Sequence, residues 1–254
     1  MISKKITMLF IILVLFACGR KESNDLFRQP VVGVIQNNQV PVLIKTIDEG
    51  KVRIEYKSTD ESAGRFTEWE KLSENYDNTT NLILTHLNPN TEYNYRVEFE
   101  DGNYSKWFKF KTFPEQGVAG KFNFIFSACF REKYMGFNIF EKIEQSSPSF
   151  VALLGDQMYS DYDGNLNELE RYLNNDSIRQ AMVEEGEIVL DDKSVLQAFR
   201  NKYNRVFDVN FQNMASSIPL MAIWDDHDYG RDNSDGTYPY KKEARKVFKE
   251  NFPD

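Results

Sequence analysis

The sequence predicts an all-β sandwich followed by part of an α/β sandwich. Short strands separated by turn residues fill the stretch from Pro30 to Pro114. Apolar and polar residues alternate clearly from Val52 to Lys57 and from Tyr93 to Phe99, as they do in strands with one solvent-facing side. Further along the chain, apolar runs without helical spacing each end in residue types that bind metals. Such runs are typical of strands in a parallel sheet.

Three apolar runs define the predicted parallel sheet. Phe150 to Leu154 leads into Gly155-Asp156, Phe122 to Ala128 leads into Cys129, and Leu220 to Trp224 leads into Asp225. The sequence predicts that the Phe150 strand is buried on both faces. The carboxyl ends of parallel strands meet along one edge, where ligands bind. Five residues could therefore converge there as candidate metal ligands or catalytic groups: Cys129, Asp156, Tyr159, Asp226 and His227.

The N-terminus predicts export. Basic residues from Met1 to Lys5 precede an apolar run from Ile6 to Phe16, which is too short to span a bilayer comfortably. Leu15 to Gly19 resembles a bacterial lipobox with Cys18 as the lipidated residue. Residues 1–18 are therefore expected to be a lipoprotein signal peptide, and residues 19–29 a tether from a cell-envelope membrane. An ordinary secretory signal with an incidental cysteine is the alternative.

Composition limits the choice of partners. The chain has 254 residues and a formal net charge of −8, so no nucleic-acid-binding surface is expected. It contains 2 cysteines. If Cys18 carries lipid, Cys129 is a free thiol in an oxidising compartment, where burial or metal binding would protect it.

The first domain is expected to span residues 30–114. Leu87 to Val97 resembles the corner of fibronectin type III domains, where a tyrosine, here Tyr93, bonds back to the preceding turn. His86 lies beside this corner and is interpreted as structural. Residues 115–121 are interpreted as a linker. The expected strands are 31–35, 40–47, 52–57, 82–87, 93–100 and 107–112.

Helical patterns separate the strands of the second part. Apolar residues at helical spacing follow Cys129, which predicts a βαβ unit. The stretch from Asp163 to Ser217 is mostly helical in pattern and is expected to form a wall of the site. One amphipathic face there follows a predicted cap at Asp192. Another helix is predicted from Lys241 to Asn251. The residues of the amphipathic face are Val195, Leu196, Phe199, Tyr203 and Val206.

Residues 122–254 resemble the alkaline phosphatase D (PhoD-like) family of calcineurin-like metallophosphoesterases. The likeness rests on four segments: Phe124 to Phe130, Gly155 to Asp161, Ile223 to Gly230 and Tyr238 to Glu243. It implies a ferric ion, calcium ions and hydrolysis of phosphate monoesters or diesters. Other divalent metals remain possible.

The resemblance also implies roles for the candidate residues. Cys129 and Tyr159 would hold iron, Asp156 would bridge metals, and Asp226 would bind a second ion. His227 would face the phosphate as a stabiliser or as the acid for the leaving oxygen. Asp225 and Arg131 complete the predicted catalytic set. The candidate phosphate contacts are Arg131 and Lys241.

Each of these residues also has a structural interpretation. Cys129 could be a small buried hydrophobe, Tyr159 and His227 could serve packing, and Asp156 and Asp226 could be turn residues. A further group of acids is interpreted as capping or solvated, and the alternative for Asp161 or Asp228 is to support the metal ligands. This group is Asp161, Asp163, Asp228 and Asp232.

One departure from the family pattern matters for function. PhoD-like proteins supply a later Gly-Asp-x-His that completes the iron site, whereas the histidines here are His86 and His227. Weak activity is therefore expected from this chain. A non-catalytic surface lipoprotein that binds a ligand through its β-sandwich is the main alternative, and a metallohydrolase acting on another ester is a third. The sequence leaves substrate and oligomeric state open.

Overall fold

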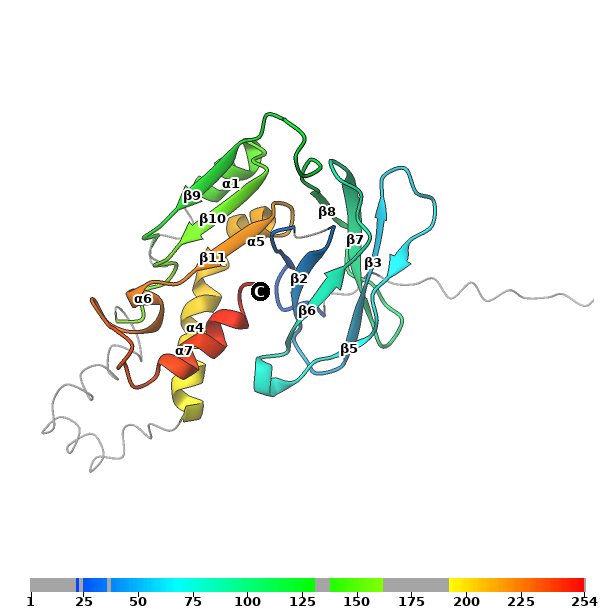
Figure 1. Cartoon of the computed structure of the whole chain (residues 1–254). Coiled ribbons are helices and arrows are strands. Elements are labelled where there is room, and N and C mark those ends of the chain that lie inside the picture. Colours follow the sequence, from blue (N-terminus) through cyan, green and yellow to red (C-terminus); the bar gives the residue numbers. More distant parts are fainter. Residues whose placement is uncertain (1–21, 23–24, 36–37, 131–137, 162–191, 254) are drawn as a thin grey trace, which may run out of the picture.

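A computed structural model describes residues 22, 25–35, 38–130, 138–161 and 192–253 of the chain. A β-sandwich and an α/β part lie side by side (Figure 1). The predicted fold class, a β-sandwich followed by part of an α/β sandwich, is confirmed. Within the described residues, no helix combines the length and apolar character needed to cross a membrane.

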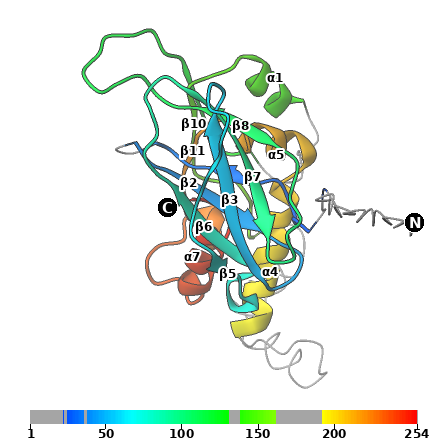
Figure 2. The same cartoon turned by 90° about the vertical axis from the view of Figure 1, so that its right-hand side faces the viewer.

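The β-sandwich pairs a three-stranded sheet with a five-stranded sheet. Figure 2 looks onto the second sheet, in which the two long strands β3 and β7 pair antiparallel. Alternate residues of β3 are buried, as the sequence pattern predicts, because one face of the strand lies on the core. The first sheet contains β1 (Val31–Val32), β2 (Val40–Lys45) and β6 (Thr79–Leu84), and the second β3 (Lys51–Ser58), β4 (Arg65–Phe66), β5 (Glu70–Lys71), β7 (Glu92–Phe99) and β8 (Phe108–Lys111).

A tyrosine holds the corner before β7. The Asn88 backbone N–H donates to the Tyr93 hydroxyl oxygen at 2.8 Å. Tyr93 is fully buried, and its ring stacks on Phe110 of β8. The predicted bond from this tyrosine back to the preceding turn is therefore present. The sequence did not predict the short strands β4 and β5 or the 3₁₀ helix η1 (Glu74–Tyr76).

The α/β part is built on three parallel strands in the order β11, β10, β9. Their bounds are Phe124–Ser127 for β9, Phe150–Leu154 for β10 and Leu220–Ile223 for β11. Val151 and Leu153 of the central strand are buried in the core beneath the helices. The helices are α1 (Ile139–Gln145), α4 (Asp192–Val206), α5 (Val209–Ala215), α6 (Asp226–Tyr229) and α7 (Lys241–Lys249). The amphipathic face predicted for α4 is buried at Val195, Phe199, Tyr203 and Val206.

The prediction that the Phe150 strand is buried on both faces holds for its centre, Val151 to Leu153, but is wrong at its end, where Leu154 is exposed. Side chains from all three strands are exposed on the face opposite the core, with Phe124 49% and Phe126 66% exposed. Leu154, Met221 and Ile223 are exposed in register with them. Helices among the described residues pack on the other face, which holds Val151 and Leu153. An apolar run shows that a strand suits burial, but it does not supply a second covering layer.

The first sheet of the sandwich also joins the two parts. Val32 and Val42 lie in the sandwich core, whereas Val31 and Leu43 lie in the core of the α/β part. Because successive side chains of a strand point to opposite faces, one thin sheet serves both cores. The buried Tyr95 hydroxyl adds a hydrogen bond to the Ser216 carbonyl oxygen at 2.7 Å.

The end of the predicted tether, residues 19–29, contacts the folded protein at Arg28 and Gln29. Arg28 is buried, and its Nη1 donates to Asn251 Oδ1 at 2.7 Å. The Arg28 guanidinium also lies 3.6 Å from the centre of the Phe207 ring. This segment therefore helps to hold the helices of the α/β part against the sandwich.

Candidate metal centre

Three strand ends meet at one edge of the α/β sheet. Cys129 follows β9, Asp156 follows β10, and Asp226 and His227 follow β11. The strands are parallel and in register, so their carboxyl ends coincide. The Cys129 backbone N–H donates to the Gly155 carbonyl oxygen at 3.2 Å, which joins the first two ends directly.

The backbone turns sharply at these ends. Cys129 has a φ of 58° and Asp156 a φ of 56°, both in the left-handed region. Gly155 has a φ of 101°, and a Cβ placed on it would lie 2.6 Å from the Asp225 Cβ. Left-handed backbone at non-glycine residues costs free energy and concentrates at functional sites. Here it aims the two side chains across the sheet edge.

The five predicted site residues lie close together. Asp156, Asp226 and His227 each offer one ligand atom, and these atoms lie within 4.8 Å of one another. Cys129 Sγ is 3.3 Å from Asp156 Oδ2, and the Tyr159 hydroxyl is 3.5 Å from the same oxygen. Carboxylate, imidazole, thiol and phenol groups are therefore gathered around Asp156.

The electrostatics of this cluster suit a cation. Burial, together with Asp156, raises the pKa of both the Cys129 thiol and the Tyr159 phenol above their usual values. Burial also raises the pKa of Asp156, against opposing effects of Cys129 and His227. A bound cation would lower these pKa values again, because it favours the charged form of each ligand.

One atom marks the place where a cation would bind. Asp156 Oδ1 is buried and has no hydrogen-bond partner among the described residues. A buried carboxylate oxygen normally has a donor or a metal ion. The residues present therefore fit a metal site.

His227 is held by a neighbouring carboxylate. Its Nδ1 lies 2.8 Å from Asp161 Oδ1, and its ring stacks on Tyr159 with 4.2 Å between ring centres. A proton on Nδ1 donates to Asp161 and fixes the ring, and Nε2 lies 3.7 Å from Asp232 Oδ1. From the sequence, Asp161 was only an alternative candidate to support the metal ligands. Its position along the chain does not show that it contacts a histidine from another strand end.

Asp228 lies deeper in the protein than its sequence context indicates. Of its two interpretations, capping is confirmed at the start of α6, whereas solvation is wrong because the side chain is completely buried. Burial raises its pKa to about 7, while backbone N–H donors from Asp225, Met158 and Asp156 act in the opposite direction. Asp225 and Asp228 also form a capping box on α6. The spacing of Asp225 and Asp228, an acid three residues after an N-cap, was the sequence signal that could have predicted this capping role.

Other predicted residues lie outside the cluster or outside the described residues. Asp225 is exposed, and its Oδ1 accepts the Asp226 backbone N–H at 2.9 Å as the cap of α6. Lys241 Nζ lies 5.2 Å from the centre of the Tyr229 ring. His86 is exposed in the sandwich, where its carbonyl oxygen accepts from Arg65. The predictions for Arg131 and Cys18 fall outside the described residues.

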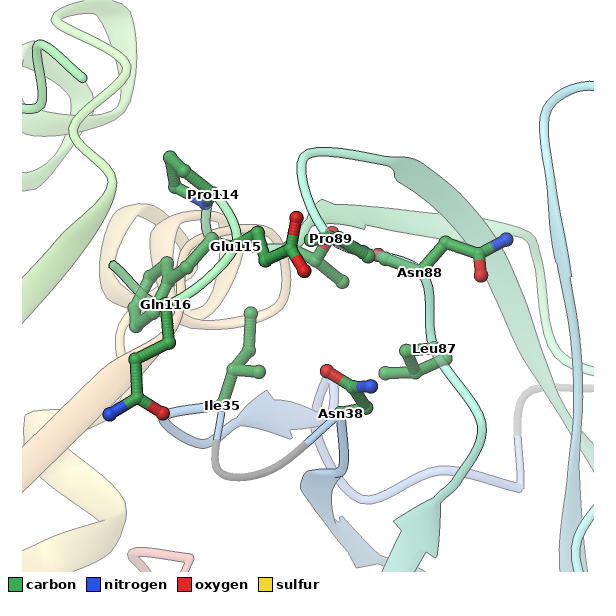
Figure 3. Close-up of a pocket in the computed structure, with 10 residues that line it drawn as sticks. Ile35, Asn38, Leu87, Asn88, Pro89, Pro114, Glu115 and Gln116 are labelled. Atoms are coloured by element: carbon green, nitrogen blue, oxygen red, sulfur yellow. The ribbon is translucent and has the colours of Figure 1, made fainter. Parts of the chain in front are cut away.

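A separate cavity of about 550 Å³ lies at the end of the sandwich nearest the 115–121 segment (Figure 3). Asn38, Asn88 and Gln116 contribute polar groups, and Leu87 and Ile35 contribute apolar ones. None of the predicted metal-binding or catalytic residues lines it. The candidate chemistry and this cavity therefore belong to different parts of the molecule.

Comparison with known proteins gives matches to both parts of the chain. The PhoD-like phosphatase family matches residues 124–251, and the purple acid phosphatase N-terminal domain matches residues 38–112. No curated protein sequence matches the chain.

Solved structures show the same fold at low sequence identity. The structure of PhoD matches with a TM-score of 0.68 and 18% identity, over 89% of this chain and 45% of that chain. A purple acid phosphatase from yellow lupin (Lupinus luteus) seeds matches with a TM-score of 0.55 and 13% identity, over 86% of this chain and 40% of that chain. The chain thus spans less than half the length of either structure. With half of its residues matched by the family model, the chain belongs to the PhoD-like phosphatase family.

Proposed function

We propose that this chain takes part in metal-dependent hydrolysis of phosphate monoesters or diesters at the bacterial cell envelope. The observation that carries the proposal is the meeting of Asp156, Asp226 and His227 within 4.8 Å, beside a buried Asp156 oxygen that lacks a partner among the described residues. The family match supports a phosphate ester as substrate.

The side chains divide into two kinds of metal ligand. The Cys129 thiol and Tyr159 phenol are donors that suit iron, and the carboxylates of Asp156 and Asp226 also suit calcium. The proposed cofactors are therefore Fe³⁺ and Ca²⁺. When bound, such cations polarise a phosphoryl oxygen and lower the pKa of a bound water.

His227 is proposed to handle the proton of the leaving oxygen. Asp161 holds Nδ1 at 2.8 Å, so Nε2 is oriented as the other functional atom of the ring. Stacking on Tyr159 keeps the ring beside the candidate ligands. General acid catalysis of this kind contributes about 10²–10⁴-fold to a rate. Asp225 acts by capping α6 and so supports Asp226 and His227.

The location is proposed from the N-terminal sequence. A basic start, an apolar run and Cys18 in a lipobox-like segment support export and a lipid anchor. Arg131 and Lys241 remain proposed phosphate contacts. Turnover by this chain is proposed to be weak, because the sequence offers only His86 besides His227 as a further imidazole ligand, and His86 lies in the sandwich.

The test combines metal content with hydrolysis. The chain is reconstituted with Fe³⁺ and Ca²⁺, its bound metal is counted, and p-nitrophenyl phosphate and bis-p-nitrophenyl phosphate are supplied as substrates. Slow, metal-dependent hydrolysis of one of them is expected, with loss of bound metal in Cys129→Ala and Asp156→Ala. A folded protein that binds no metal, or that hydrolyses neither substrate, would refute the proposal.

A further inference from the structure

The Asp228 carboxylate connects the two turns that carry the candidate ligands. Its Oδ2 accepts the backbone N–H of Asp156 at 2.6 Å and that of Asp225 at 3.0 Å. Its Oδ1 accepts the backbone N–H of Gln157 at 3.0 Å and that of Met158 at 3.3 Å. One buried side chain from the turn after β11 thus holds three successive amides of the turn after β10.

This arrangement explains the unusual backbone at Asp156. With a φ of 56°, the chain turns so that successive N–H groups point the same way, and such a concave set of donors binds an anion. Burying a carboxylate is costly unless hydrogen bonds replace its water. Four backbone donors meet that requirement for Asp228. The same turn directs the Asp156 side chain toward Asp226 and His227.

Helix α4 adds a third point of attachment. The Tyr203 hydroxyl donates to Asp228 Oδ1 at 3.2 Å, and Lys202 Nζ donates to the Tyr159 carbonyl oxygen at 2.8 Å. Both side chains are buried. Neighbouring residues of α4 therefore hold the two ends of the turn that carries Asp156 and Tyr159.

We propose that Asp228, with Tyr203 and Lys202, is a positioning residue that fixes Asp156 and Tyr159 relative to Asp226 and His227 before a cation binds. This inference rests on the proposed metal-binding function. Metal affinity then depends on the Asp228 carboxylate, which is not itself a ligand. Partners that orient metal ligands typically change affinity about 10–100-fold when removed.

The experiment measures Mn²⁺ binding to the full chain by electron paramagnetic resonance of the free ion. Asp228→Asn keeps the size of the side chain but turns an amide donor toward backbone N–H groups. Tyr203→Phe removes only the hydroxyl. The matched control is Asp208→Ala, which removes the Asp208 carboxylate that accepts the Phe211 backbone N–H at 2.8 Å at the start of α5.

Asp228→Asn is expected to raise the Kd for Mn²⁺ about 10–100-fold and to speed hydrogen exchange at the amides of Asp156, Gln157 and Met158. Tyr203→Phe should raise the Kd about 2–10-fold, as one lost hydrogen bond implies. Asp208→Ala should lower the melting temperature and leave the Kd unchanged. That contrast separates positioning of ligands from a general loss of stability.

Each outcome decides the matter. A folded Asp228→Asn with an unaltered Kd overturns the inference. If that variant does not fold, an unaltered Kd in Tyr203→Phe overturns it. Weakened Mn²⁺ binding in a protein that hydrolyses no phosphate ester leaves the positioning role standing and removes the proposed function, whereas a parent chain that binds no Mn²⁺ overturns both.

Discussion

The two parts of the molecule use their sheets differently. In the β-sandwich, two sheets share one core between them. In the α/β part, the three-stranded sheet has helices on one face, while Phe124, Phe126 and Ile223 are exposed on the other. The candidate metal centre lies at the edge of this three-stranded sheet where the carboxyl ends of its strands meet. The strand ends thus bring the candidate ligands together although, among the described residues, one face of the sheet is exposed.

The two parts also differ in what their turns do. Turns of the sandwich connect successive strands, as the corner at Tyr93 does. Left-handed non-glycine residues occur in turns of both parts, but at the ends of β9 and β10 they are the candidate ligands Cys129 and Asp156. The Asp156 backbone N–H also donates to Asp228, which lies far along the chain. The following changes test this contrast, in order of decreasing effect.

The largest effect is expected from Gly155→Ala, compared with Gly102→Ala. Both glycines have positive φ, but only at Gly155 would a Cβ collide with Asp225, at 2.6 Å, whereas no atom lies within 4 Å at Gly102. Gly155→Ala should cost about 3 kcal/mol or more of unfolding free energy and should abolish Mn²⁺ binding. Gly102→Ala should cost about 1–2 kcal/mol, from backbone strain alone. Urea unfolding measures both, and equal costs would show that the two turns are not distinct.

The next effect concerns the junction between the two parts. Burial, with help from the charge of Arg28, lowers the pKa of Lys45 to about 8 in the folded chain, although Lys45 pairs with Asp77. The folded pKa is below the unfolded one, so the unfolded chain holds more protons between pH 8 and 10.5. Stability is therefore expected to rise with pH across that window, by about 1–3 kcal/mol.

Urea midpoints measured in steps from pH 7.5 upward check this expectation. Lys45→Met removes the titrating group and should flatten the rise, while Lys109→Met, at an exposed position, should not. A parent chain that loses stability between pH 8 and 10, relative to Lys45→Met, would contradict the assigned direction.

A smaller effect is expected from Tyr93→Phe. This change leaves the ring packed on Phe110 but removes the acceptor of the Asn88 backbone N–H. The loss should cost about 1–2 kcal/mol of unfolding free energy. Thermal unfolding measures it, and Mn²⁺ affinity should stay unchanged because the corner lies in the sandwich. Weaker Mn²⁺ binding would mean that the sandwich contributes to the site.

The smallest effect on stability is expected on the open sheet face. Phe126 is 66% exposed, so Phe126→Ser should alter the unfolding free energy by no more than about 0.5 kcal/mol. It should also reduce binding of the dye ANS, which reports exposed apolar surface. Phe110→Ser, at a buried position of the sandwich, should by contrast unfold the domain. Equal ANS binding by the parent and Phe126→Ser would show that the dye does not bind at the exposed sheet face.

Much of the fold could be predicted because its signals are local. Alternation defined β3 and β7, helical spacing defined α4, and the tyrosine corner could be inferred from a short segment. The two-residue strands β4 and β5 were missed because such short pairings leave no periodic pattern. The contact of Arg28 with Asn251 was not predicted, since a polar stretch looks the same whether it faces solvent or binds another residue.

By itself, the sequence determined which chemical groups follow which strands, because an apolar run ending in Cys129, Gly155-Asp156 or Asp225 to Asp228 specifies a strand and the polar groups at its end. The tertiary structure alone decided that Asp161 meets His227, that Asp228 holds the turn at Asp156, and that one sheet face is exposed among the described residues. The reason is physical: burial and hydrogen-bond partners depend on what packs against a residue, and these partners come from segments far away along the chain.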